Sequence, residues 1–151
     1  ELISAIGTQN SARFNALLAT KNELEKSGLS PELIEQLTAQ IEKAKADFAV
    51  FAKQQTRITP NSTWVDFSAP QPGVIPGGSQ QTQQDLIVYE NVIAMLETGG
   101  KHDELPVGTL IRVDNRWRLL GLPGRDEGGF FFRVADQVMG WAVSLILGLG
   151  R

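Results

Sequence analysis

Few side chains in this chain have the types and spacing that catalysis requires. There is no cysteine, which excludes disulfides, thiol chemistry and cysteine-based zinc or iron–sulfur sites. The only histidine is His102, and one imidazole cannot build a multi-histidine metal site. A Ser-His-Asp triad would have to use His102, but the Gly-x-Ser-x-Gly elbow that would support it is missing. We therefore expect no metal, no cofactor and a solvated histidine.

The stretch GTLIRVDNRWRLLGLP, residues 108–123, brings Arg112, Arg116 and Arg118 close to Trp117. It is either an anion-binding site or the last hairpin of a sheet. With Asn115 in the left-handed position of a three-residue turn, Arg112 pairs with Arg116 and Ile111 with Trp117. The arginines then share a solvated face with Leu110, opposite a buried face that holds Thr109, Ile111, Trp117 and Leu119. We favour the hairpin, with solvated arginines and Trp117 in the core.

Composition and charge narrow the function classes further. The chain has 151 residues, 42% of them hydrophobic and 21% charged, as in a globular domain. Its net charge of −3, without a basic block, argues against a nucleic-acid partner. The longest apolar run starts at Val138 and is shorter than the roughly 20 residues of a membrane span. Because the chain begins with Glu1, we expect a processed or truncated product.

Residues 1–59 are predicted to form an antiparallel helical hairpin. Apolar residues at helical spacing indicate a first helix over 11–27. Gly28, Ser30 and Pro31 form a junction that ends one helix and begins the next. The second helix carries a seam with spacings of 3 and 4 residues and stops before Pro60: Ile34, Leu37, Ile41, Ala44, Phe48, Phe51. The seam suits either a coiled coil or packing on the first helix and a sheet, and we favour packing.

Residues 62–122 are predicted to form an antiparallel sheet. STWVDFSA alternates like a strand, and residues 70–84 read as a long surface loop. Residues 85–97 fit either a helix capped by Asp85 or a central strand. We predict a strand, because β-branched and aromatic residues occupy both faces. TGGKHDE then forms the turn into a strand that begins near Leu105.

The predicted organisation is therefore one α+β domain over residues 1–133, followed by an apolar segment over 134–151. A short helix is expected from about Val134, with Val138, Trp141 and Leu145 on one stripe. Such a segment must cover the sheet or meet another subunit, because it would aggregate if it were exposed.

Helices followed by a meander of long strands, ending in the Val-Asp-Asn-Arg-Trp-Arg-Leu hairpin, resemble the NTF2/SnoaL-like, or cystatin-like, α+β cone. STWVDFSAPQPGVIP, DLIVYENVIAMLETGGK and GTLIRVDNRWRLLGLP also resemble the N-terminal segments of bacterial extracytoplasmic proteins with a TlpA-type thioredoxin-like domain. The likeness covers residues 8–133. It implies a curved sheet around the helices and an exported, periplasmic or secreted protein. Thiol–disulfide exchange is not implied, because the cysteine pair is missing.

The NTF2-like resemblance also suggests a small-molecule pocket lined by Trp64, Asp66, Tyr89 and Trp117. In a water-poor cone Asp66 could act as a general base. This hypothesis requires Asp66 and Tyr89 to point into a shared cavity. His102, in the predicted turn, is badly placed to join them.

We favour a non-enzymatic accessory module that mediates the packing of a homodimer or of a neighbouring domain. The hypothesis rests on the surplus of apolar surface in the second helix and the tail, and on the lack of a reactive set of side chains. A third hypothesis is attachment of the tail to a membrane surface. Since Arg133 and Arg151 are the only cations of the tail, it matches an interfacial helix poorly.

Overall fold

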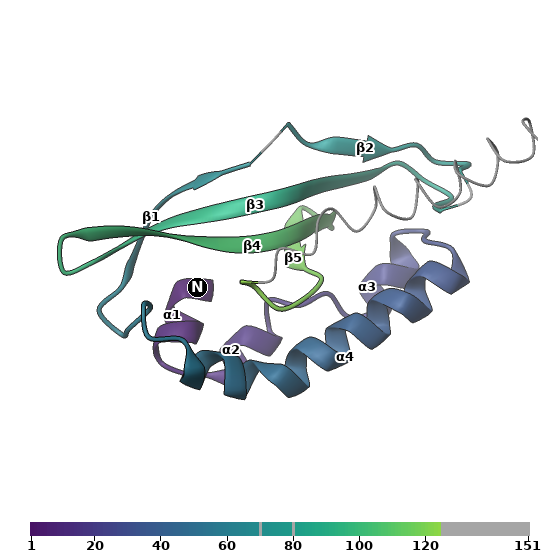
Figure 1. Cartoon of the computed structure of the whole chain (residues 1–151). Coiled ribbons are helices and arrows are strands. Elements are labelled where there is room, and N and C mark those ends of the chain that lie inside the picture. The colour runs from purple at the N-terminus through teal and green to yellow at the C-terminus, as the bar shows by residue number, and fades with distance from the viewer. Residues whose placement is uncertain (70, 80, 125–151) are drawn as a thin grey trace, which may run out of the picture.

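The computed structural model describes residues 1–69, 71–79 and 81–124, which form helices on one side of an open antiparallel sheet (Figure 1). The described helices are α1 (Leu2–Gly7), α2 (Ser11–Asn15), α3 (Lys21–Lys26) and α4 (Pro31–Gln54). The described strands are β1 (Thr63–Ser68), β2 (Gly73–Ile75), β3 (Leu86–Thr98), β4 (Lys101–Val113) and β5 (Arg116–Leu119). The predicted α+β class, with N-terminal helices on an antiparallel sheet, is confirmed. The boundary at residue 133 and the helix expected from Val134 lie outside the described residues.

Helix α4 forms where its apolar seam predicts it. The Ser30 hydroxyl accepts a hydrogen bond from the Leu33 amide, and Pro31 occupies the first turn. After the last turn, the Gln55 side chain accepts from the Ile58 amide and donates to the Ile58 carbonyl, which turns the chain away. The buried face of α4 is Leu33, Leu37, Ile41, Ala44, Phe48 and Ala52. At its centre Phe48 stacks on Phe14, with ring centroids 4.2 Å apart.

The single helix predicted over residues 11–27 is wrong, because the chain forms α2 and α3 with a break between them. In the break the Ala19 amide donates to the Leu119 carbonyl, and the Leu119 amide donates to the Leu17 carbonyl, each at 2.9 Å. The segment thus extends the sheet beyond β5. The helix restarts at Thr20, whose side chain and that of Glu23 form a capping box.

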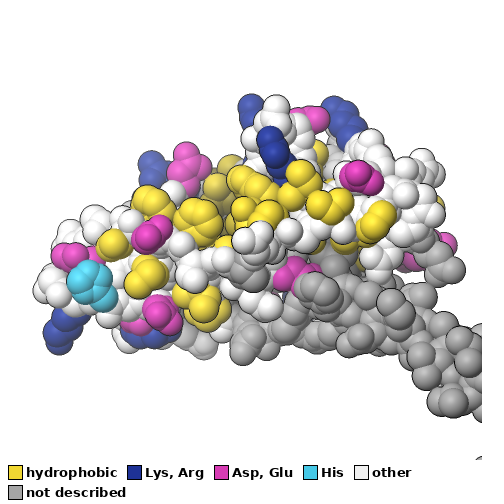
Figure 2. All heavy atoms as spheres, turned by 90° about the horizontal axis from the view of Figure 1, so that it is seen from above, with side chains coloured by type: hydrophobic (Ala, Val, Ile, Leu, Met, Phe, Trp, Pro, Cys, Tyr) yellow, Lys and Arg dark blue, Asp and Glu magenta, His cyan; other side chains and the backbone are white. Residues whose placement is uncertain are grey.

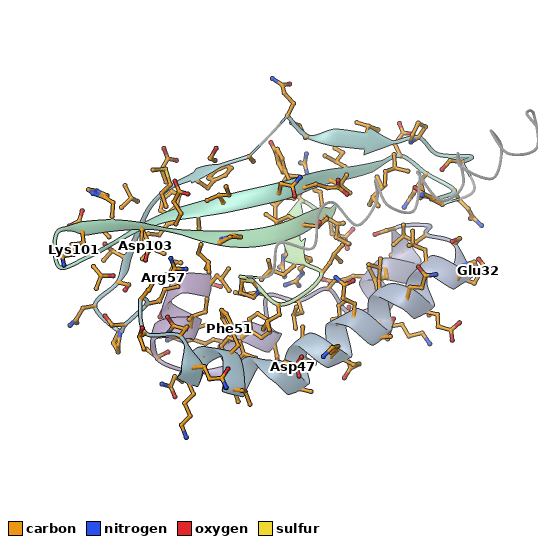
Figure 3. The ribbon with its side chains drawn as sticks, in the orientation of Figure 1. Glu32, Asp47, Phe51, Arg57, Lys101 and Asp103 are labelled. Atoms are coloured by element: carbon orange, nitrogen blue, oxygen red, sulfur yellow. The ribbon has the colours of Figure 1, made fainter. Side chains whose placement is uncertain are left out.

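Two polar contacts fix the helices against the rest of the fold. The Gln40 amide nitrogen donates to the Leu120 carbonyl at 3.0 Å. Arg57, in the segment after α4, points to Asp103 on β4 and pairs with it at 2.8 Å (Figure 3). The long helix is therefore tied to both ends of the β4–β5 region.

The sheet has the order β1-β3-β4-β5, and β2 pairs with β3 beside β1. Residues 86–98 form the strand β3, as predicted. The loop predicted over 70–84 contains β2, because Val74 and Ile75 pair with the start of β3. Strand β4 begins at Lys101, not near Leu105, because Gly99 and Gly100 adopt positive φ and close a two-residue turn. His102 therefore lies in a strand opposite Glu97 and not in a turn.

The predicted register of the β4–β5 hairpin is wrong by one residue. Asp114 and Asn115 both have positive φ, 47° and 61°, so the turn has two residues. Arg112 consequently pairs with Trp117, and Ile111 with Arg118. A shift of one residue moves every side chain of β5 to the other face. Trp117 turns to the other face and is 41% exposed, Arg118 turns toward the helices, and Leu119 stays buried.

Candidate functional site

The two faces of the sheet differ in what covers them. We call the face toward the helices the inner face and the opposite one the outer face. Along β3 the inner residues are buried: Leu86, Val88, Glu90, Val92, Ala94 and Leu96. The residues between them point to the outer face, as alternation in a strand requires. In the described part of the chain, every helix lies on the inner side (Figure 1).

The outer face is nonetheless apolar over much of its length. Tyr89 pairs with Leu110 and Ile93 with Pro106, so these side chains share that face. The two register shifts between Tyr89 and Ile93 cancel, which keeps the alternation in phase at both ends of β3. We call the apolar residues of this face the outer apolar band: Val74, Ile87, Tyr89, Ile93, Met95, Pro106, Leu110 and Trp117. Figure 2 shows hydrophobic side chains gathered along this face.

An aromatic pair lies within the band. The rings of Tyr89 and Trp117 are 4.8 Å apart and tilted by 48°. Trp117 is 41% exposed although its ring contacts Tyr89. The Arg112 guanidinium beside it donates to the Asn115 side chain at 2.7 Å, which holds its charge at the hairpin turn. A large aromatic surface is thus open to solvent next to a fixed cation.

The charges of the outer face lie at its ends. Asp66 and Glu104 both pair with Met95, from opposite neighbouring strands. Glu97 lies further along β3, with its carboxylate 3.5 Å from the His102 imidazole. Arg112 occupies the opposite end of β4. One end of the band is therefore rich in carboxylates, and the other carries a guanidinium.

The four residues predicted to line a pocket are not gathered. Trp64 pairs with the inner residue Leu96, whereas Asp66 pairs with the outer residue Met95. The carboxylate of Asp66 is exposed and accepts from the Phe67 amide at 2.8 Å. Six residues of β3 separate its level from Tyr89, about 20 Å at ~3.3 Å per residue. Only Tyr89 and Trp117 meet, so the shared cavity that general-base chemistry at Asp66 requires is not formed.

The predicted hairpin register placed Arg118 on a solvated face, and this prediction is wrong. It lies on the inner side and donates through Nε and Nη2 to the Glu23 carboxylate, at 3.0 and 2.8 Å. It also donates to the Ala16 carbonyl at 2.8 Å. Its side chain is 17% exposed and that of Glu23 is 18% exposed. Arg112 and Arg116 are exposed, as predicted for all three arginines.

The pKa of Glu23 reflects this pair. Burial disfavours the charged carboxylate, but hydrogen bonds from the Thr20 amide and from Arg118 outweigh it. The pKa of Glu23 is therefore held below its usual value. Arg118 thus closes the break between α2 and α3 against β5, which is a structural role.

Sequence reasoning treated β3 as a covered central strand and so missed the outer apolar band. The signal was available, since residues 86–96 are apolar on both faces. A strand that is apolar on both faces is expected to be packed against other protein on both sides, and in this sheet the described helices pack on the inner side (Figure 1).

Within the described ranges, no group of three histidine, aspartate or glutamate side chains could hold a metal ion. Among the described helices, none combines the length and the apolarity needed to cross a bilayer. Comparison with protein-family models, with curated proteins and with solved structures found no match for the chain. The outer apolar band, defined by its strand pairing, is the candidate functional site.

Proposed function

We propose that the chain is a non-enzymatic packing module, which binds an apolar protein surface through the outer apolar band. One observation carries the proposal: a continuous set of apolar side chains occupies the sheet face that the described helices leave uncovered. Water contact with such a surface is unfavourable in proportion to its area. Binding of another protein surface removes that cost.

The dimensions of the face suit a protein partner. Strands β3 and β4 each have 13 residues. At ~3.3 Å per residue and ~4.8 Å between strands, β3 and β4 form a strip about 43 Å long and about 10 Å wide. The shorter strands β1, β2 and β5 widen it only in part, so the face covers on the order of 600 Å². A standard protein–protein interface buries about 800 Å² on each partner, with an apolar centre, aromatic residues and a polar rim. The Tyr89–Trp117 pair within the band and the charges at its ends follow this pattern.

Thiol labelling tests the proposal without knowledge of the partner. Because the chain has no cysteine, one substitution creates a single reporter thiol. Val74→Cys places it on the outer face and Val50→Cys on the free side of α4. The two valines are matched, since they are 57% and 56% exposed. In native extracts of cells that produce the protein, we expect a maleimide to label the thiol at 74 at least ~10-fold more slowly than the thiol at 50.

Unfolding in urea supplies the control, because both thiols must then react at the same rate. Equal rates for the two thiols in the native extract would refute the proposal. A slower reaction at position 50 would point to the helical side as the binding surface instead.

We further propose that this module is an accessory segment of an exported protein, and that its sheet belongs to the NTF2-like or cystatin-like cone class. The order of elements supports this class, because helices precede a long antiparallel meander. A fusion of the full-length gene product to alkaline phosphatase tests the export. The fusion enzyme becomes active only where its disulfides form, outside the cytoplasm. An inactive but stable fusion would contradict export.

A further inference from the structure

We infer that the partner of the outer apolar band is a second copy of this chain, related by a two-fold axis that runs across the strands between the two sheets. The inference rests on the proposed function and adds the identity and orientation of the occupant. It follows from where the charges of the outer face lie.

The carboxylates gather at one end of the face. Asp66, Glu97 and Glu104 belong to three adjacent strands near the β3–β4 turn, where the His102 imidazole approaches only Glu97. The neighbouring cations do not neutralise this end. Lys101 pairs with Thr98, Arg57 pairs with Asp103, and both Lys101 and Asp103 lie on the inner side by alternation. The outer face is therefore acidic here.

The guanidinium of the outer face lies at the opposite end. Arg112 is separated from Glu104 by eight residues of β4, about 26 Å at ~3.3 Å per residue. Arg116 is exposed in the same hairpin, and Asp114 lies between them in the turn. Because the Asn115 side chain holds Arg112, its charge stays at the rim of the apolar band.

A two-fold axis across the strands brings the charged groups at both ends of the outer face opposite groups of the other sign. Midway between Glu104 and Arg112 along β4 is Gly108, which pairs with Val92. With the axis at that level, the acidic end of each copy lies over Arg112 of the other, and the apolar bands meet between them. A closed two-fold interface is isologous, so each favourable charge contact is formed twice. An axis parallel to the strands would instead place carboxylates over carboxylates, which is unfavourable.

The first test is the dissociation constant of the purified full chain, measured by sedimentation equilibrium. We expect a reversible dimer. Glu104→Arg and Arg112→Glu should each weaken it about tenfold, because each places like charges together. The double variant with both reversals should restore it to within about threefold of the original. Glu42→Arg, which reverses a charge on the exposed side of α4, is the matched control and should have no effect.

A second test does not depend on charge. Ile93 pairs with Pro106, two residues from the level of the inferred axis, so the two copies of Ile93→Cys lie about 13 Å apart along the strands. A bifunctional maleimide with a spacer of about that length should join the two thiols. Val50→Cys should give no covalent dimer. Far-ultraviolet circular dichroism of each variant confirms that it is folded.

The outcomes separate this inference from the proposed function. A purified chain that stays monomeric with a reactive thiol at position 74, while the same thiol is protected in extracts, overturns the second copy and leaves the packing module standing, because another protein then occupies the band. A purified monomer whose thiol at position 74 stays protected overturns both, because the chain then covers its own band. A dimer whose dissociation constant is unchanged by either charge reversal overturns the two-fold arrangement. A thiol at position 74 that reacts with the maleimide in native extracts as fast as the thiol at position 50 overturns both.

Discussion

The inner and outer faces of one sheet are built from alternate residues of the same strands, yet they differ in burial. On β3 the inner residues Val88 and Leu96 are buried beneath helices, whereas Tyr89 and Met95 keep part of their surface in water. Both sets are apolar. An apolar pattern thus predicts burial but does not say which element provides the cover. In this fold helices cover the inner residues of β3 but leave the edge strand β1 exposed, and we propose that association covers the outer face.

Phe48→Ala should break the inner side most severely. Phe48 is fully buried and stacks on Phe14, so its loss leaves a cavity that the flanking helices cannot fill. We expect the free energy of unfolding to fall by about 3–5 kcal/mol. Urea denaturation followed by circular dichroism measures it. Val50→Ala, on the exposed side of the same helix, should change it by less than about 0.5 kcal/mol.

Ile111→Ala and Leu110→Ala test the two faces at adjacent residues of β4. Ile111 points to the inner face and is fully buried, so its truncation should cost about 2–5 kcal/mol of stability. Leu110 points to the outer face, so its truncation should cost less than about half of that in the monomer, but should weaken the dimer more than tenfold. Urea denaturation of the monomer and sedimentation equilibrium separate the two effects. Equal stability losses with no change in association would refute the distinction between the faces.

Arg118→Met should give a smaller loss on the inner side. It removes the donor to Glu23 Oε1 and to the Ala16 carbonyl in a partly dry site, while the Thr20 amide still donates to Glu23 Oε2. We expect a loss of about 1.5–3 kcal/mol, typical of hydrogen bonds to charged groups. Arg116→Met, at an exposed position of the same strand, should stay within about 0.5 kcal/mol of the original. Similar losses for the two variants would contradict the buried role of Arg118.

The pH dependence of stability should reveal the same pair with a still smaller effect. Because the pKa of Glu23 is lower in the folded state than in the unfolded chain, the unfolded state binds more protons as the pH falls. The stabilisation is therefore complete well above pH 4.5, the ordinary glutamate value, and is lost as the pH falls through the lowered pKa. Urea denaturation between pH 6 and pH 3 should show a shallower loss for Glu23→Gln. Parallel curves would contradict a lowered pKa.

Elements set by local spacing could be predicted from the sequence. The seam of α4, with Ser30 and Pro31 before it, requires only neighbouring residues, and so does the alternation of β3. The break after α2 could not be predicted in the same way, because it depends on Leu119, a hundred residues further along the chain. One local signal was missed: Thr20 and Glu23 have the spacing of a capping box.

The candidate site was predicted less well, and the reason is geometric. One residue of register decided where Trp117 and Arg118 point, and the choice between a two- and a three-residue turn at Asp114 and Asn115 set that register. The bulge at Val65 likewise separated Trp64 from Asp66 across the sheet. The side-chain types alone suggested a pocket, but the alternation of the strands placed Trp64 on the inner face and Asp66, Tyr89 and Trp117 on the outer face.

The pairing of Leu17 and Ala19 with Leu119 also constrains the order in which the chain can fold during synthesis. Helices α2 and α3 leave the ribosome early, yet the segment between them finds its partner only after the final hairpin has been made. Contacts between such distant residues carry a large loop-closure entropy and slow folding. A nascent chain stalled before residue 119 would therefore leave Leu17 and Ala19 without their backbone partner, and the segment around them open to proteases and chaperones.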